Sequence, residues 1–152
     1  MSTRWQIAAK LTDGRSACIY VHCDGYPDYA LTTLQQHYRD QQKIDRLISL
    51  GDCSSVGDEI EECETFHGRG EPWEDVCPTY GDDLATVADR HQHGDEEYRY
   101  TWDGQQWKAE TRIMSRGGSQ WQFVLSPVPT CESAYGLGDT GRALAQELSG
   151  GR

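Results

Sequence analysis

The stretch WQIAAKLTDGRSACIYVH, residues 5–22, indicates the fold more clearly than any other part of the chain. It consists of two β-rich runs on either side of the turn dipeptide Asp13-Gly14. In the second run Ala17, Ile19 and Val21 alternate with other residue types, so one side of a strand there would be apolar. Alternation across an Asp-Gly turn is typical of a β-hairpin. We therefore expect the two runs to pair as antiparallel strands.

Two short amphipathic helices are expected after this hairpin. Apolar residues fall at helical spacing over residues 29–38, where Asp28 is a suitable N-cap. A second helical pattern over residues 44–50 ends at Gly51, a residue type that commonly terminates helices. The two helices would form a helical hairpin that covers one face of a sheet.

The second half of the chain predicts further strands. Residues 98–102 alternate, Asp103-Gly104 makes a turn, and residues 107–113 return as a partner strand. Another alternating run follows at residues 121–125, and residues 140–148 are expected to form a last short helix.

Together these elements predict one α+β domain over residues 1–152, with an antiparallel sheet of about five strands. The helical hairpin would pack on one face, and residues 52–97 would be a long, acidic, loop-rich segment. No run approaches the ~18 apolar residues of a membrane span, and residues 1–5 lack the apolar core of a signal peptide. We therefore expect a cytoplasmic location.

The charge of the chain is concentrated in residues 52–97. Fifteen Asp and Glu stand there against two Arg, which gives −13, while the whole chain carries −11 and its other residues therefore +2. Such a field repels nucleic acid and membrane headgroups and attracts basic protein surfaces. We expect no direct DNA binding, no membrane contact, and a basic nucleic-acid-binding protein or complex as the partner. The carboxylates expected to bind it are Asp58, Glu59, Glu61, Glu62, Glu64, Glu71, Glu74, Asp75, Asp82 and Asp83.

Potential metal ligands are present without a diagnostic spacing. The six cysteines include no CxxC pair, which is the strongest zinc pattern. Cys53, Cys63, His67 and Cys77 are the alternative for a structural zinc, but buried small thiols explain them more simply, and no cofactor is expected. His91 and His93 lack an identifiable third ligand, so we expect them on an exposed loop.

The run after the first hairpin offers a possible ligand site. His22 and Asp24 stand beside a Gly-Tyr-Pro turn, and His37 lies on the following helix, which can fold back over the strand end. These residues and Tyr26 could bind a ligand, and a His-Asp-His arrangement could hold a metal or act as acid and base. The alternative is a structural turn in which Gly25 takes a positive φ.

The residues IYVHCDGYP (19–27), HY (37–38), LGDCSS (50–55) and RGE (69–71) together resemble a family of small proteins encoded by phages, prophages and plasmids. The likeness covers roughly residues 1–75 and the hairpin near 98–108. This chain has Cys53 where the relatives tend to have an aliphatic residue, which argues against a shared ligand role for that thiol. The resemblance implies a gene of a mobile genetic element in a bacterial host.

We therefore expect a non-enzymatic binding protein that inhibits a host defence complex, most specifically an anti-CRISPR protein. Its carboxylates would mimic phosphates and occupy a Lys/Arg groove that normally binds nucleic acid. One alternative is a sponge for a signalling nucleotide, which would use the aromatic residues of the sheet. The other is a small metal-dependent hydrolase that uses His22, Asp24 and His37. The aromatic residues in question are Tyr98, Tyr100, Trp102, Trp107 and Trp121.

Overall fold

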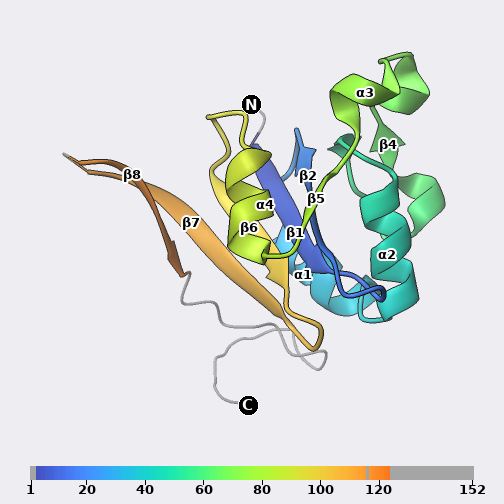
Figure 1. Ribbon diagram of the computed structural model, residues 1–152, viewed down its shortest axis with the longest axis horizontal. Coiled ribbons are helices and arrows are strands. Elements are labelled where there is room, and N and C mark those ends of the chain that lie inside the picture. Colours follow the sequence, from blue (N-terminus) through green and yellow to red (C-terminus); the bar gives the residue numbers. More distant parts are fainter. Residues whose placement is uncertain (1–2, 116, 124–152) are drawn as a thin grey trace.

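The computed structural model describes residues 3–115 and 117–123, which form one sheet with helices on both of its faces (Figure 1). The predicted helix at 140–148 lies outside the described residues. No helix in the described residues is long and apolar enough to cross a membrane. In chain order the elements, with short 3-10 helices labelled η, are β1 (Trp5–Lys10), β2 (Ser16–Val21), α1 (Ala30–His37), α2 (Gln41–Ser49), β3 (Cys53–Ser55), η1 (Ile60–Glu62), β4 (Glu64–Thr65), η2 (His67–Arg69), α3 (Trp73–Val76), β5 (Thr79–Gly81), α4 (Leu84–Arg90), β6 (Tyr98–Trp102), β7 (Trp107–Ser115) and β8 (Gly118–Phe123).

The sheet has eight strands and is mixed, so the predicted antiparallel sheet of about five strands is wrong. Its order is β4-β3-β2-β1-β6-β7-β8, and β5 pairs with β2 off this path. β1 runs parallel to β6, and β2 runs parallel to β3. These pairings join segments far apart in the chain, and a local alternation pattern carries no information about them.

The two predicted hairpins are confirmed. β1 and β2 pair antiparallel with Ile7 opposite Ile19, and Gly14 in their turn has a φ of 91°. β6 and β7 pair antiparallel across Asp103-Gly104, where Gly104 has a φ of 104°. Both glycines take a backbone conformation that a side chain disfavours, which is why the Asp-Gly pattern located the turns correctly.

The two predicted helices are confirmed as α1 and α2, and both pack on one face of the sheet. The side chain of Asp40 caps α2 by accepting a hydrogen bond from the Lys43 amide. Asp28 does not cap α1, whose N-cap position is Tyr29 without a side-chain bond. The helices enclose an apolar core against β1, β2 and β6, which contains Trp5, Ile7, Ile19, Val21, Leu34, Ile44, Leu47, Ile48, Tyr100 and Trp102.

The opposite face is covered by α4, so the expectation of helices on one side only is wrong. The buried apolar cluster on this face is small and consists of Ala8, Cys18, Val87 and Ala88. Gln6 and Arg99 are buried on the same face. Figure 1 shows α4 lying across the central strands.

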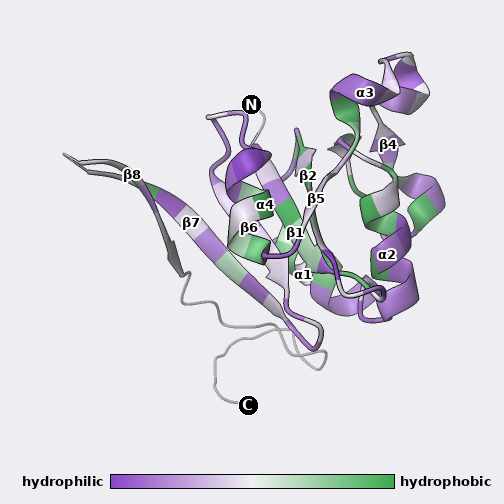
Figure 2. Cartoon of the chain, viewed as in Figure 1, coloured by the Kyte–Doolittle hydropathy of each residue, from purple (hydrophilic) through white to green (hydrophobic). Residues whose placement is uncertain are grey.

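The acidic segment is more ordered than predicted. Residues 52–97 contribute three strands to the sheet, β3, β4 and β5, together with α3, α4 and the two 3-10 helices. The strands are two or three residues long, which is too short for alternation to reveal them. Figure 2 shows mostly hydrophilic residues on α3 and β4.

Candidate functional site

The most distinctive polar group of the described residues surrounds Asp52, which lies between α2 and β3. Its amide donates to the Val76 carbonyl at 2.8 Å, and its own carbonyl accepts from the Phe66 amide at 3.1 Å. Gly51 before it has a φ of 76°, and a Cβ there would lie 2.5 Å from the Val76 oxygen. These backbone contacts therefore hold Asp52 in place, and its side chain is only 3% exposed.

Two imidazoles approach the Asp52 carboxylate. His91 Nε2 lies 2.7 Å from Oδ1, and His93 Nε2 lies 3.7 Å from Oδ2. Oδ1 also accepts a hydrogen bond from the Tyr20 amide at 3.0 Å. One ligand-type atom from each of Asp52, His91 and His93 lies within 4.8 Å of the others. We call these three residues the Asp-His-His group.

The end of α4 positions His91. It is the C-cap residue of that helix, and its amide donates to the Val87 carbonyl. Its Nδ1 lies 2.7 Å from the Thr79 hydroxyl on β5. Nε2 is thereby directed at Asp52. The expectation of an exposed loop is wrong for His91, whose side chain is only 10% exposed.

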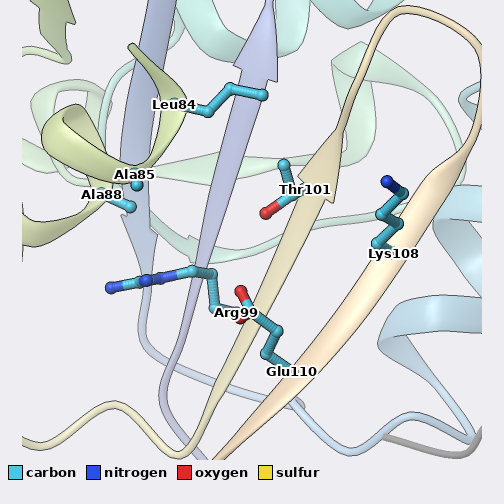
Figure 3. Close-up of a pocket in the computed structure, with 7 residues that line it drawn as sticks. All are labelled: Leu84, Ala85, Ala88, Arg99, Thr101, Lys108 and Glu110. Carbon is cyan, nitrogen blue, oxygen red and sulfur yellow. The ribbon is translucent and has the colours of Figure 1, made fainter. Parts of the chain in front are cut away.

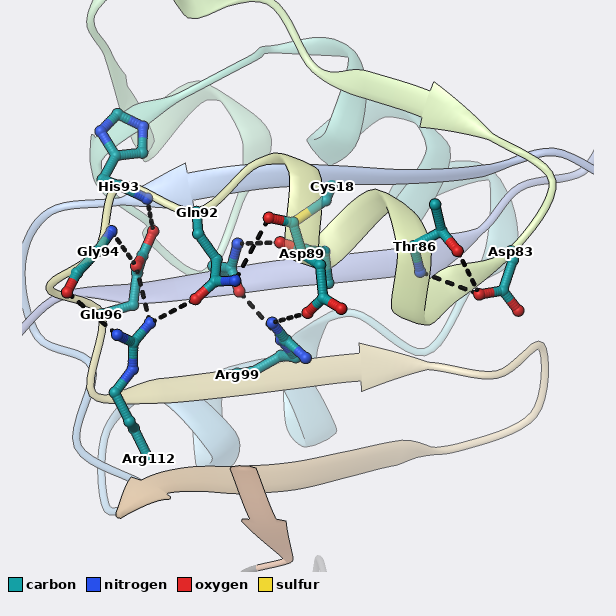
Figure 4. Close-up of polar contacts among 12 residues, drawn as sticks. Cys18, Asp83, Thr86, Asp89, Gln92, His93, Gly94, Glu96, Arg99 and Arg112 are labelled. Carbon is teal, nitrogen blue, oxygen red and sulfur yellow. Dashed lines mark hydrogen bonds and ion pairs between the residues drawn. The ribbon is translucent and has the colours of Figure 1, made fainter. Parts of the chain in front are cut away.

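A hydrogen-bonded loop positions His93. Its amide donates to Glu96 Oε2 at 2.6 Å, and the Gly94 amide donates to Glu96 Oε1 at 3.1 Å. Glu96 is fully buried and pairs with Arg112 at 3.3 Å. Figure 4 shows this carboxylate at the centre of the loop. The Tyr20 ring stacks on the His93 imidazole at a centroid distance of 4.0 Å, which fixes its plane.

Further polar residues extend from Tyr20. Its hydroxyl lies 2.9 Å from His22 Nδ1, and Arg4 Nε donates to the same nitrogen at 3.4 Å. Arg4 also pairs with Asp95 at 3.1 Å. Burial raises the pKa of Tyr20 to about 12, so its hydroxyl keeps its proton at neutral pH.

The predicted ligand residues at the turn do not gather into one site. His22 bonds to Tyr20 and Arg4, whereas His37 lies 3.5 Å from Asp58. No group of three potential metal ligands in the described residues includes His22, Asp24 or His37. Tyr26 is 56% exposed.

The turn at 22–27 is instead tied to the core. The Trp5 indole donates to the Cys23 carbonyl at 2.7 Å, and the Tyr100 hydroxyl donates to the Gly25 carbonyl at 2.6 Å. The positive φ belongs to Asp24, at 67°, and not to Gly25 as predicted. Gly25 is required for another reason, because a Cβ there would lie 2.7 Å from the Thr3 oxygen.

The four residues considered for a structural zinc site do not come together at one place in the fold. Cys53 is buried in the core, and Cys63 Sγ lies 3.5 Å from the Tyr38 hydroxyl. His67 Nδ1 contacts the Glu71 carbonyl, and Cys77 Sγ the Glu74 carbonyl. No three of the four lie within ligand distance of one another. Burial raises the pKa of the Cys53 thiol far above its ordinary value.

The ten carboxylates predicted to bind a partner are all exposed. Glu59 pairs with Lys43 at 3.1 Å and Glu61 with Arg46 at 3.8 Å, and Asp83 caps α4. The side chains of five others make no hydrogen bond or ion pair with the described residues. These five are Glu64, Glu71, Glu74, Asp75 and Asp82.

A small pocket of about 180 Å³ lies between α4 and the strands β6 and β7. Figure 3 shows Arg99 and Thr101 on β6 and Lys108 and Glu110 on β7 around it. The aromatic rings proposed for nucleotide stacking do not line it. Tyr100, Trp102 and Trp107 are buried in the core on the other face of the sheet.

Sequence reasoning recognised the two histidines and missed their partner. Asp52 is 39 residues from His91, and they meet because β3 and β5 both pair with β2, so no spacing rule connects them. The only available signal was a Gly-Asp dipeptide directly after a helix.

Comparisons with known proteins identified no relative, since no family model, curated protein or solved structure matches the chain.

Proposed function

We propose that this protein is a binding protein of a mobile genetic element that inhibits a host defence complex by occupying a basic nucleic-acid groove. An anti-CRISPR protein is the most specific form of the proposal. The single observation that supports it is the set of ten exposed carboxylates on residues 58–83, half of which make no hydrogen bond or ion pair with the described residues. We call this set the acidic surface.

Local cations compensate little of the acidic surface. Lys43 and Arg46 of α2 each pair with one carboxylate, and His37 of α1 lies beside another. An exposed carboxylate without a local partner contributes its full charge to the field in front of the protein. That field favours a partner whose surface carries many Lys and Arg.

The position of these carboxylates suits contact with a partner. They lie on η1 and just before it, on β4, after η2, on α3 and in the loop before α4, and all of them are exposed. Replacing phosphates by carboxylates in a cationic groove uses the same release of counterions that drives nucleic-acid binding. This mode of binding requires no catalytic residue on the acidic surface.

Charge reversal with a matched control tests the proposal. Glu71→Lys with Glu74→Lys adds four charges, because each acidic-to-lysine change adds two. The control Asp28→Lys with Gln36→Lys and Gln42→Lys also adds four, as two plus one plus one, at exposed positions outside the acidic surface. Each protein is used as bait in nuclease-treated bacterial lysate, and the captured proteins are identified by mass spectrometry.

The wild-type protein and the control are expected to capture nucleic-acid-binding proteins, and the Glu71/Glu74 variant to lose them. The loss should lie mainly in the association rate and shrink as salt rises, since exposed charges are screened within ~8–10 Å. Equal loss in both variants would mean that only net charge matters. Full capture by the Glu71/Glu74 variant would refute the proposed surface.

The specific form has its own assay. In a bacterium whose CRISPR system blocks a phage, expression of the protein is expected to restore plaque formation, while the Glu71/Glu74 variant should not. Purified protein is expected to give no gel shift with duplex DNA at physiological salt. Tight DNA binding would exclude the mimicry mechanism.

A further inference from the structure

We propose that Asp52, His91 and His93 form a binding site for a divalent transition-metal ion, with Zn²⁺ as the best match. The proposal does not depend on the function proposed above. The sequence led us to expect no cofactor, and the Asp-His-His group is the reason to depart from that expectation.

The ligand chemistry selects the class of ion. Two imidazole nitrogens and one carboxylate oxygen suit Zn²⁺ and its neighbours in the first transition row, whereas Mg²⁺ and Ca²⁺ prefer oxygen ligands throughout. Zn²⁺ binds such atoms at about 2.0–2.1 Å, so tetrahedral ligand atoms lie roughly 3.3 Å apart. The two short distances involve different oxygens of Asp52, with His91 Nε2 2.7 Å from Oδ1 and His93 Nε2 3.7 Å from Oδ2. One ligand atom from each of the three residues lies within 4.8 Å of the others, so binding one ion requires small side-chain movements.

The burial of Asp52 supplies a physical reason for a cation. A carboxylate removed from water needs a compensating charge or several hydrogen bonds. Among the described residues no Arg or Lys forms an ion pair with Asp52. Its close charged or chargeable neighbours are the two histidines, and imidazole is the commonest protein ligand for metals.

Outer contacts hold each ligand in place, as they do in metal sites. The Tyr20 amide bonds to the carboxylate, and its ring stacks on His93. The Thr79 hydroxyl contacts Nδ1 of His91, which leaves Nε2 to bind the ion. The Glu96 carboxylate holds the loop of His93. The ligands come from two segments of the chain, one with Asp52 and the other with His91 and His93, and each is positioned by contacts outside the group.

The site is closed on one side and open on the other. Asp52 and His91 are nearly buried, while the His93 side chain is 46% exposed. Three protein ligands leave a fourth position of a tetrahedral ion, which water can reach from the His93 side. An ion with an open position is typical of zinc sites that bind or activate a small molecule, whereas structural sites use four protein ligands.

Metal titration of the full-length, reduced and chelator-treated protein tests the site. One equivalent of Zn²⁺ is expected to bind and to raise the Tm, since an ion that binds only the folded state stabilises it. Mg²⁺ and Ca²⁺ should leave the Tm unchanged. Co²⁺ should give the visible absorption of a four-coordinate site without thiolate charge-transfer bands.

Three variants locate the site. His93→Ala, at the exposed ligand, should keep the fold and weaken Zn²⁺ binding by more than about 100-fold. Thr79→Val, which removes only the contact to His91 Nδ1, should weaken it by 10–100-fold, as is typical of outer partners. His67→Ala, at an exposed histidine elsewhere, should bind like the wild-type protein.

Each remaining outcome would overturn the proposal. Absence of saturable Zn²⁺ binding by the wild-type protein would mean that the group is a structural hydrogen-bonded cluster only. Unchanged affinity in His93→Ala, or thiolate bands with Co²⁺, would place the metal on other residues.

Discussion

On the face of the sheet covered by α1 and α2, Ile7 and Tyr100 pack in an apolar core, whereas their chain neighbours Gln6 and Arg99 are buried under α4. Gln6 Nε2 donates to the Ala88 carbonyl at 2.8 Å, and Arg99 Nε donates to Gln6 Oε1 at 3.0 Å. The same two strands, paired in the same register, thus present opposite chemistry on their two sides. We infer that the apolar face supplies most of the stability, while the polar face fixes how α4 and the loop carrying His93 are placed.

The largest effect is expected from the apolar face. Ile19→Ala should lower the free energy of unfolding by about 2–5 kcal/mol, because it removes buried methyl groups and leaves a cavity among well-packed neighbours. Val87→Ala under α4 should cost less, about 2 kcal/mol. Chemical denaturation measures both. A larger loss for Val87→Ala would reverse the inferred roles of the two faces.

A polar-to-apolar change on the other face should destabilise the protein although it adds apolar surface. Gln6→Leu leaves the Ala88 carbonyl and Arg99 Nε without their partner, at a cost of about 1–3 kcal/mol. The matched change Ile7→Leu, one residue along and on the apolar face, should cost less than about 1.5 kcal/mol. Equal melting temperatures for the two variants would show that the buried polar contacts contribute nothing.

Two buried thiols of the described residues report how easily each face opens. Burial raises the pKa of Cys18 under α4 and of Cys53 in the apolar core, so neither thiol reacts until local opening exposes it. Since α4 covers few apolar residues, Cys18 should be alkylated on the order of tenfold faster than Cys53, and both far more slowly than Cys77. Pulsed alkylation with mass spectrometry measures the rates. Faster labelling of Cys53 would contradict the comparison.

The smallest effect is expected at Glu110 on β7, beside Arg99 and Lys108 and across from Asp89 of α4. Burial raises the pKa of Glu110, with Arg99 opposing and Asp89 adding to the shift. The folded state therefore holds this proton more tightly than the unfolded state, which makes the charged form slightly destabilising at neutral pH. Glu110→Gln should raise stability at pH 7 by about 0.5 kcal/mol.

The pH dependence checks the sign of that effect. As pH falls through the raised pKa towards the ordinary value of the carboxyl, wild-type Glu110 becomes protonated and the difference from Glu110→Gln should disappear. Thermal melts at pH 7 and near pH 4 measure it. A difference that grows on acidification would mean that the charged carboxylate is stabilising.

Local features of the sequence predicted local structure well. The Asp-Gly turns placed both hairpins, and helical spacing placed α1 and α2, because these signals act between residues close in the chain. The same reasoning gave the wrong sheet. The pairing of β1 with β6 depends on residues about ninety positions apart, and β3 to β5 are too short to show a period.

The candidate site was predicted only in part, for the same reason. His91 and His93 were noticed as a pair, but Asp52 reaches them only because β3 and β5 both flank β2. The exposure of the ten candidate carboxylates followed from their charge, which disfavours burial, whereas Asp52 and Glu96 of the same segment are buried. The function of that surface stays a prediction.

The parallel pairing of β1 with β6 also has a consequence for how the chain folds while it is being synthesised. Gln6 and Arg99 are 93 residues apart, so β1 is synthesised long before its partner exists. Until then the β1–β2 hairpin has an unpaired edge, the kind of surface through which nascent chains aggregate. The segment made during this interval carries the charge of −13. Mutual repulsion between partly finished chains therefore protects the open edge for as long as it lasts.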